Sequence, residues 1–334
     1  MTKPKVDIII PFHEQTSMLN EAISSAQESS MVSVRIIAIN DSGLAVSKSE
    51  LGLREVDLLE NSNIKGYQGA LATGVGLSTA EFITFLDSDD ILDKEKIFHQ
   101  LAALETENAD LATGEILRFS RSINHTFQSP LNSNLISRMS QLEKSIFGSY
   151  GADSTMLFKS SKLKKTWGIH SSFPSRLSDF GWLLSVLPSI KIIHCKSAVY
   201  YYRTHQSQMS RVGDLKSEWS ALHPLWILNL RTFLGESSLR FPEISPSISQ
   251  AIVFPTSLPK LGRTERAELT SVLKAIAEKL HINYPSERKT ISYLIGIRLT
   301  IANRGLNPRY FAYSILLFFK IIYSLNLGNR MRSQ

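Results

Sequence analysis

The chain has 334 residues but only one cysteine, Cys195, so a disulfide bond within the chain is excluded. A single thiol is typical of proteins from a reducing compartment, where disulfides rarely persist. A signal peptide is not expected either, because a strand pattern begins at Val6 and leaves no room for one. We therefore expect a cytoplasmic protein in which Cys195 is a small buried side chain.

Acidic residues are missing from the end of the chain, where Glu287 is the last one. The basic residues that follow it are Arg288, Lys289, Arg298, Arg304, Arg309, Lys320, Arg330 and Arg332. Such a segment suits a membrane surface or a nucleic acid, and a merely solvated basic helix is the simplest alternative. Neither zinc-ligand spacing nor a basic–aromatic repeat occurs, so we do not expect a nucleic-acid partner.

Long hydrophobic runs are also scarce, and the apolar segment from Tyr310 to Leu327 is interrupted by Lys320 and several polar residues. It falls short of the ~20 apolar residues that cross a membrane. Residues 309–332 suit a helix that lies in the membrane interface, with its arginines near anionic headgroups. Burial against the rest of the protein is the alternative, and the sequence favours neither.

The composition is that of a globular protein, with 43% hydrophobic and 20% charged residues, and the length fits one large or two modest domains. Early in the chain, short apolar runs alternate with segments of helical spacing. The runs are Val6–Ile10, Val34–Ile39, Val56–Leu59 and Phe82–Leu86. This alternation predicts right-handed βαβ crossovers and an α/β fold with a mostly parallel sheet flanked by helices.

The remainder of the chain changes character twice. Residues 120–135 are polar and predict a loop. Between about 150 and 211, short strand patterns surround one helical pattern; the strands are expected at Thr155–Phe158, Ile190–His194 and Val199–Tyr202, and the helix at Asp179–Leu187. From about 215, helical stretches broken by prolines predict a helical C-terminal region over 215–334.

Three carboxylates, Asp87, Asp89 and Asp90, directly follow the last of the early apolar runs. Like charges repel, and a divalent cation that carries a phosphate ester is a natural counter-charge, because Mg2+ and Mn2+ prefer carboxylate and phosphate oxygen. In open α/β sheets the ligand crevice lies beyond the carboxyl ends of the strands. The cluster therefore indicates a phosphate-ligand site, and a solvated acidic turn is the alternative.

Five pieces of the sequence, in this order, resemble the family 2 glycosyltransferases of GT-A fold over roughly residues 5–211. They are Val6–Glu14, Asn40–Gly43, Gly66–Ile83 running into Asp87-Ser88-Asp89, Leu177–Trp182, and Tyr202–Ser210. The Asp-x-Asp signature alone is weak evidence, whereas the five pieces together are strong. The resemblance implies a Rossmann-like GT-A catalytic domain over 1–214, with a nucleotide half (about 1–115) and an acceptor half (about 116–214).

Several positions depart from the family pattern and put individual roles in doubt. His13 and Glu14 replace the usual Tyr and Asn, Leu71 and Ala72 replace an Arg and an Asn, and Ser178 replaces the first acid of a Glu-Asp pair. Base stacking would then involve an imidazole, one phosphate contact would be lost, and Asp179 would act alone.

The activity implied by the resemblance is sugar transfer from a nucleotide-diphosphate sugar to an acceptor hydroxyl. The departing diphosphate must be neutralised, and the hydroxyl must lose its proton. The residues implied for the nucleotide sugar are Pro11, His13, Asp41, Asp87 and Ser88, and those for Mn2+ or Mg2+ are Asp89 and His205. A turn residue bonded to its own backbone is the alternative for Asp41, and a cap on the following turn is the alternative for Asp90.

The candidate general base is Asp179, near the start of an expected helix. A helix cap is the alternative for it. Its aromatic neighbours Phe180 and Trp182 would reduce its solvation and raise its pKa, although Trp182 is equally suited to anchor the core. Because one base and no second nucleophile is evident, the resemblance implies inversion at the anomeric carbon.

Two other functions fit parts of the sequence. A haloacid-dehalogenase-type phosphatase also places Asp-x-Asp after an apolar strand and would use Asp87 as a covalent nucleophile. The two earlier strands that end in ligand-like turns argue against it. A non-catalytic nucleotide-binding scaffold is the other alternative, given the departures from the family pattern. A calcium-binding EF-hand is excluded, because Ile91 and Leu92 stand where an oxygen ligand and glycine are required.

We therefore predict a metal-dependent, inverting glycosyltransferase for hexosyl or N-acetylhexosaminyl transfer in surface-polysaccharide assembly. The expected donor is a UDP-sugar by family habit, with guanosine and thymidine donors left open. The expected acceptor is a saccharide or a lipid-linked saccharide, presented at the cytoplasmic face of the membrane, where residues 309–332 would make peripheral contact.

Overall fold

The structure is a computed structural model that describes residues 4–14, 17–48, 56–120, 122–128, 152–170, 172, 177–187, 189–205, 208, 215–235, 244–253 and 263–279. The chain divides into two compact units. The first comprises Met1–Gln128 and Tyr150–Glu218, and the second comprises Ser129–Ser149 and Trp219–Gln334. The segment 309–332 and the basic residues after Glu287 lie outside the described residues, so the interfacial helix stays a prediction.

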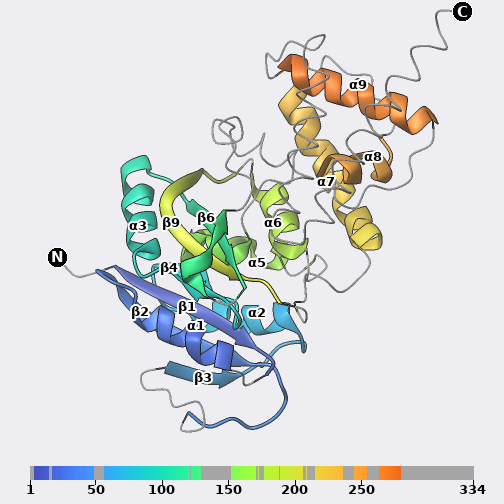
Figure 1. The fold of residues 1–334 in the computed structure, drawn as a ribbon. Coiled ribbons are helices and arrows are strands. Elements are labelled where there is room, and N and C mark those ends of the chain that lie inside the picture. Colours follow the sequence, from blue (N-terminus) through green and yellow to red (C-terminus); the bar gives the residue numbers. More distant parts are fainter. Residues whose placement is uncertain are drawn as a thin grey trace, which may run out of the picture. The chain divides into compact units, whose positions relative to one another are not determined.

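The first unit is built on a nine-stranded sheet in the order β3-β2-β1-β4-β8-β6-β9-β5, with β7 paired to β6. Figure 1 labels strands β1, β2, β3, β4, β6 and β9 of this sheet. Its strands are β1 (Lys5–Phe12), β2 (Ser33–Asn40), β3 (Val56–Glu60), β4 (Phe82–Phe85), β5 (Ile91–Leu92), β6 (Leu111–Phe119), β7 (Phe127–Gln128), β8 (Leu157–Lys159) and β9 (Ile192–Arg203). The longest pairings, β1 with β2 and β6 with β9, are parallel. The predicted α/β class and the four early strands are confirmed.

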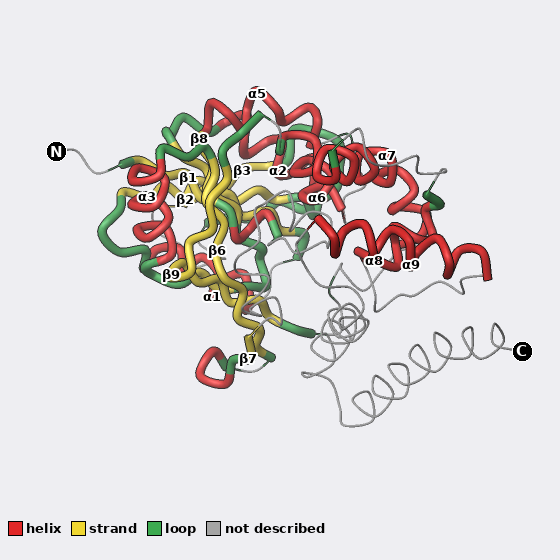
Figure 2. The backbone as a smooth tube through the Cα atoms, turned by 90° about the horizontal axis from the view of Figure 1, so that it is seen from above, coloured by secondary structure: helices red, strands yellow, loops and turns green. Residues whose placement is uncertain are grey.

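The second half of the sheet differs from the sequence expectation in two respects. Strand β8 enters between β4 and β6 and is antiparallel to both. The two strands expected at Ile190–His194 and Val199–Tyr202 are one continuous strand, β9, beside β6 (Figure 2). A shift of register between Gly114 and Glu115 absorbs the interrupted apolar pattern, as a β-bulge does.

The expected loop at 120–135 also contains regular structure in its described part. A short 3-10 helix, η1 (Ile123–His125), precedes β7, and β7 pairs antiparallel with β6. Residues 129–135 lie outside the described residues. The prediction of an unpatterned loop is therefore wrong for the segment that ends at Gln128, because pairing with a neighbouring strand supplies order that the local sequence does not signal.

Helices cover both faces of the sheet, and the two faces follow from the alternation along the strands. Ile8 and Ile10 point to the side of α1 (Ser17–Gln27) and α3 (Lys96–Glu107). Ile9 points to the opposite side, with α2 (Tyr67–Leu77), α5 (Ser160–His170) and α6 (Ser178–Val186). The helix expected at Asp179–Leu187 is thus α6, and Trp182 lies in its buried face.

The described part of the second unit is helical, as expected from about residue 215 onward. Its helices are α7 (Leu215–Leu234, which begins in the first unit), α8 (Pro246–Val253) and α9 (Arg263–Lys279). Buried Trp219 donates a hydrogen bond of 2.9 Å to Ser249, which ties α7 to α8. Among the described residues, no helix has both the length and the apolar character needed to cross a membrane.

The carboxyl ends of the parallel strands lie at the edge of the sheet where the site forms. Strands β1, β2 and β4 run in the same direction and finish at Phe12, Asn40 and Phe85. The polar residues that follow each strand therefore meet at one edge of the sheet. This is the edge at which open α/β sheets bind ligands.

Candidate active site

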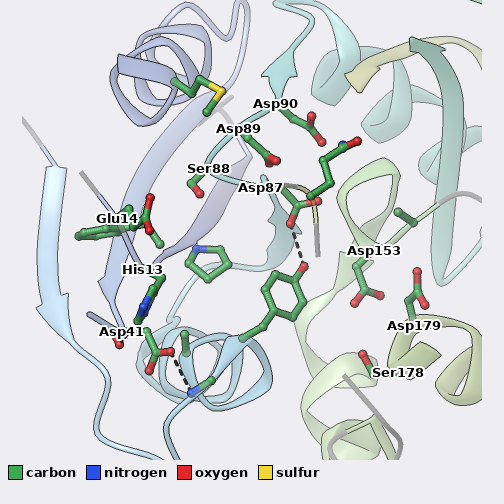
Figure 3. A pocket seen from close by; sticks show the side chains of 18 of the residues that line it. His13, Glu14, Asp41, Asp87, Ser88, Asp89, Asp90, Asp153, Ser178 and Asp179 are labelled. Atoms are coloured by element: carbon green, nitrogen blue, oxygen red, sulfur yellow. Dashed lines mark hydrogen bonds between the residues drawn. The ribbon is translucent and has the colours of Figure 1, made fainter. Parts of the chain in front are cut away.

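A pocket of about 770 Å3 lies at this edge, and all its lining residues belong to the first unit. Every site residue predicted from the sequence lines it: Pro11, His13, Asp41, Asp87, Ser88, Asp89, Asp179 and His205. In Figure 3, His13 and Asp41 lie toward one end, and Asp153, Ser178 and Asp179 toward the other. Asp87 and Asp89 lie on the turn after β4. The fold thus brings together residues from five separate parts of the sequence.

At the first end, the carboxylate of Asp41 holds a neighbouring loop. It accepts hydrogen bonds from Asn61 Nδ2 at 2.7 Å and from the backbone N–H of Gly66 at 2.9 Å. Gly66 has φ of +123°, a conformation that residues with side chains rarely adopt. The Nδ1 of His13 donates to the backbone carbonyl of Asp41 at 3.2 Å. Asp41 therefore fixes the entry to α2, and the alternative of a turn bonded only to itself is wrong.

Asp87 is held by two hydroxyl groups in the centre of the pocket wall. Tyr67 donates to Oδ1 at 2.9 Å, and Ser154 donates to Oδ2 at 3.0 Å. Burial, and then the charge of Asp89, raise the pKa of Asp87 to about 6. Burial and the charge of Asp87 likewise raise the pKa of Tyr67, so its phenol keeps its proton and donates. The two hydroxyl groups thus hold the Asp87 carboxylate in place, although burial and the charge of Asp89 disfavour its ionised form.

Asp89 pairs with His205, whose Nε2 lies 2.7 Å from Oδ2 of the carboxylate. Within the described ranges, no group of three or more His, Cys, Asp or Glu side chains is placed to hold a metal ion. Mg2+ is usually held by one or two carboxylates together with substrate phosphates, and Mn2+ accepts the same oxygen donors. A pair of one carboxylate and one imidazole therefore fits a divalent cation that binds together with a diphosphate.

Asp90 does not cap the turn that follows it, and that alternative is wrong. Its side chain is buried and accepts hydrogen bonds from the hydroxyl of Tyr200 at 2.7 Å and the backbone N–H of Arg203 at 2.6 Å. Burial, and then the charges of Asp87 and Asp89, raise the pKa of Asp90 well above its usual range. Asp90 thus ties the acidic turn to β9.

At the other end of the pocket, Asp179 lies in the first turn of α6. Its Oδ1 accepts the backbone N–H of Phe180 at 2.7 Å. Trp182 is an anchor of the core: its ring meets Phe158 edge-on, and its Nε1 donates to Thr166. Trp182 therefore anchors α6 to β8 and α5.

Several residues of the site were missed in the sequence. Asp153 is a buried carboxylate in the short 3-10 helix η3 (Asp153–Thr155), and it lines the pocket near Asp179 in Figure 3. Tyr67 and Ser154 hold Asp87, while Tyr200 and Arg203 hold Asp90. The available signals were weak: Tyr67 stands at the start of the glycine–alanine helix, and Asp153 precedes a short apolar strand.

The fold is an α/β fold of the GT-A type, and the site has an acidic turn at the switch between parallel and antiparallel strands. Residues 7–167 match the model of the family described as Glycosyl transferase family 2. The chain therefore carries a family 2 glycosyltransferase domain and is a glycosyltransferase. The predicted family, GT-A fold and enzyme class are confirmed.

Two curated proteins are similar to the chain. One is the UDP-Glc:alpha-D-GlcNAc-diphosphoundecaprenol beta-1,3-glucosyltransferase WfgD of Escherichia coli, 24% identical over 227 residues, which cover 65% of this chain and 85% of WfgD. The other is Glycosyltransferase GlyA of Streptococcus pneumoniae serotype 4, 24% identical over 231 residues, which cover 64% of this chain but only 32% of GlyA.

Solved structures share the fold at low identity. TarS 1–349 of S. aureus in complex with UDP-GlcNAc has a TM-score of 0.55 and 14% identity, with 97% of this chain and 92% of that chain covered. The mannosyltransferase PcManGT of Pyrobaculum calidifontis, in complex with GDP-Man and Mn2+, has a TM-score of 0.50 and 14% identity, with 83% and 87% covered. The phosphatase and scaffold alternatives have no support among these comparisons.

Proposed function

We propose that the pocket catalyses metal-dependent, inverting transfer of a hexosyl or N-acetylhexosaminyl group from a nucleoside-diphosphate sugar to an acceptor hydroxyl. The observation that carries the proposal is the lining of one pocket, in which the Asp89–His205 pair and Asp179 occur together with Asp41 and His13. Such a reaction needs a group that neutralises the departing diphosphate, a general base for the acceptor hydroxyl, and a binding site for the nucleoside.

The nucleoside binds at the end formed by Pro11, His13 and Asp41. The exposed ring of His13 is oriented by its bond to the Asp41 carbonyl, so that it presents a flat face to the base. Both oxygens of the Asp41 carboxylate already accept one hydrogen bond. Each oxygen of a carboxylate has a second lone pair, so Asp41 still has capacity for a base edge.

The diphosphate binds at the acidic turn. Asp89 and His205 would hold Mn2+ or Mg2+, which when bound would neutralise the charge that develops on the departing diphosphate. Asp87 and Ser88 contact the ribose, and the two hydroxyl donors on Asp87 keep its carboxylate turned toward the pocket.

The acceptor hydroxyl loses its proton to Asp179. The backbone N–H of Phe180 donates to Oδ1 of Asp179, which holds the carboxylate at the pocket wall on the first turn of α6. Attack by the hydroxyl then forms the new glycosidic bond as the bond to the diphosphate breaks. One displacement on one carbon inverts its configuration.

The relatives support a choice of donor and acceptor. The TarS structure is a complex with UDP-GlcNAc. The name of WfgD describes a UDP-glucose donor and a diphosphoundecaprenol-linked acceptor. We infer a UDP-sugar donor and a saccharide or lipid-linked acceptor for this chain. A cytoplasmic location, with peripheral contact at the inner face of the membrane, belongs to the same proposal.

Thermal-shift binding tests the proposal, because a ligand that binds the native state raises its melting temperature. UDP, GDP, dTDP, CDP and their sugars are compared with and without Mn2+. The expected result is a metal-dependent rise with one nucleotide that disappears in Asp89→Asn. The matched control is Asp93→Asn, because Asp93 follows the same turn and does not line the pocket. A wild type that responds to none of the nucleotides would overturn the proposed function.

A further inference from the structure

The hydroxyl of Tyr200 lies beneath the acidic turn and touches both of its ends. It donates to Asp90 Oδ2 at 2.7 Å and accepts the backbone N–H of Asp87 at 3.4 Å. The ring of Tyr200 is fully buried in the core between the sheet and helices α1 and α3. One oxygen atom therefore bridges the first and last residues of Asp87-Ser88-Asp89-Asp90, whose side chains are drawn in Figure 3.

Strand β9 contacts the acidic turn a second time through Arg203, three residues after Tyr200. The backbone N–H of Arg203 donates to Asp90 Oδ1 at 2.6 Å, and its Nε donates to the backbone carbonyl of Asp89 at 2.6 Å. Arg203 is itself held in place, because its guanidinium pairs with Glu21 at 2.7 Å and stacks on the ring of Phe119 at 4.6 Å. The end of β9 is thus a rigid support for the turn.

The residues that follow β9 also position the imidazole of His205. Thr204 donates its backbone N–H to the carbonyl of Phe119 at 2.8 Å, and His205 donates its own N–H to Gln208 at 3.3 Å. Gln208 in turn donates to the carbonyl of Arg203. Residues 200–205, together with Gln208, therefore place His205 against Asp89 and hold the backbone carbonyl of Asp89 close to it.

We propose that the Tyr200 hydroxyl, acting through Asp90, is a positioning group that sets the Asp89–His205 pair for the cation and diphosphate of the donor. The inference rests on the proposed function. Three carboxylates on one turn repel one another, so the turn keeps its shape only if hydrogen bonds hold it. Packing alone does not explain the tyrosine, because a phenylalanine ring would fill the same space without either bond.

The test is Tyr200→Phe, which removes the bridging oxygen and keeps the ring. Its matched control is Tyr201→Phe on the next residue, whose hydroxyl donates to Asp93 at 3.4 Å and which does not line the pocket. Calorimetry with UDP and saturating Mn2+ measures the affinity for the nucleoside diphosphate, with GDP, dTDP and CDP used in turn if UDP does not bind. Calorimetry with uridine, or with the matching nucleoside, measures the affinity of the nucleoside part of the pocket alone.

We expect Tyr200→Phe to weaken metal-dependent nucleoside-diphosphate binding about tenfold or more, with nucleoside binding unchanged, and Tyr201→Phe to match the wild type. The Mn2+ concentration for half-maximal binding should rise in parallel. Equal binding by both variants, or an equal loss of nucleoside and diphosphate binding, would overturn the inference. If the wild type binds no nucleoside diphosphate, the proposed function itself fails.

A second variant covers the case in which Tyr200→Phe does not fold. Asp90→Asn keeps the size of the side chain and removes a buried charge, but its amide nitrogen cannot accept one of the two hydrogen bonds. It should fold and show the same selective loss of diphosphate binding. Full binding by Asp90→Asn would count against the inference.

Discussion

The phenol of Tyr67 donates a hydrogen bond of 2.9 Å to Asp87, and the two residues lie in one wall of the pocket although they come from α2 and from the turn after β4. The bond favours the charged carboxylate, while burial and the charge of Asp89 oppose it more strongly, and the pKa of Asp87 is raised to about 6. The site therefore keeps a carboxylate whose charge weakens the fold, as functional sites often do.

Asp87→Asn should stabilise the protein at neutral pH and abolish sugar transfer. Asp87 binds its proton more tightly in the folded state (pKa about 6) than in the unfolded state (pKa 3.8), so its stability penalty is absent below about pH 4. The penalty grows as pH rises through about 6 and is then constant. Urea unfolding without metal should show a gain of about 1–3 kcal/mol at pH 7.5 and almost none at pH 4. A gain that is the same at both pH values would contradict the assignment.

Asp179→Asn should lower kcat by about 100- to 10,000-fold, because the amide cannot accept the proton of the acceptor hydroxyl. Its size and its contact with the Phe180 N–H can be retained, so nucleotide binding should remain close to that of the wild type. Initial-rate assays and calorimetry on the same preparation check both points. If the variant kept half or more of the activity, the base would lie elsewhere, and Asp153, which lines the same pocket, would be examined next.

Two glycines of α2 should respond in opposite ways to alanine. A Cβ at Gly69 would lie 1.7 Å from the backbone carbonyl oxygen of Ile64, in the loop that Asp41 holds. Gly69→Ala should therefore cost about 2 kcal/mol or more and weaken nucleotide binding. A Cβ at Gly76 would point into open space, so Gly76→Ala should gain about 0.5–1 kcal/mol. Thermal unfolding and nucleotide titration of both variants test this contrast.

Lys96→Met should stabilise the protein at neutral pH. Lys96 is fully buried at the start of α3, where its ammonium group donates to the Thr84 hydroxyl at 3.3 Å, and burial lowers its pKa to about 7. The unfolded state holds the proton up to about pH 10.5, so the penalty is fully present below about pH 7 and falls as pH rises from about 7 to 10.5.

The expected gain for this variant is about 2–4 kcal/mol at pH 7 and little at pH 10, measured by urea unfolding. Thr84 remains satisfied, because its hydroxyl donates to the Met156 carbonyl. The matched control is Lys94→Met on the exposed turn before α3, which should change the stability by less than about 0.5 kcal/mol at either pH. A Lys96→Met gain that persists undiminished at pH 10 would contradict the lowered pKa, because it would show that folding does not change the proton affinity of the lysine.

Much of the nucleotide half was predictable because its elements are local. Strand β1 is buried on both faces, so apart from Asp7 it appears as the apolar run that is typical of parallel strands. The helices on each side follow the 3.6-residue spacing of their buried residues. The edge that carries Asp41 and Asp87 follows from strand direction alone, since the ends of parallel strands meet on one side of the sheet.

The acceptor half was less predictable because its order depends on pairing across the sheet. Strand β8 has three residues and is antiparallel to both of its neighbours, which no local pattern signals. Strand β9 continues through an interruption in its apolar pattern because β6 pairs with it on both sides of the register shift. The short β7 forms for the same reason.

The sequence by itself determined the α/β class, the family and which chemical groups the site holds, because these depend on spacing along the chain. Only the tertiary structure decided the partners: His205 beside Asp89, Tyr200 beneath Asp90, Asp153 in the same wall as Asp179, and a lysine at position 96 in the core. Hydrogen bonds and burial depend on which strands become neighbours, and that choice is made by the packing of residues that are far apart in the sequence, such as Phe82 with Lys159 and Ile91 with Tyr201.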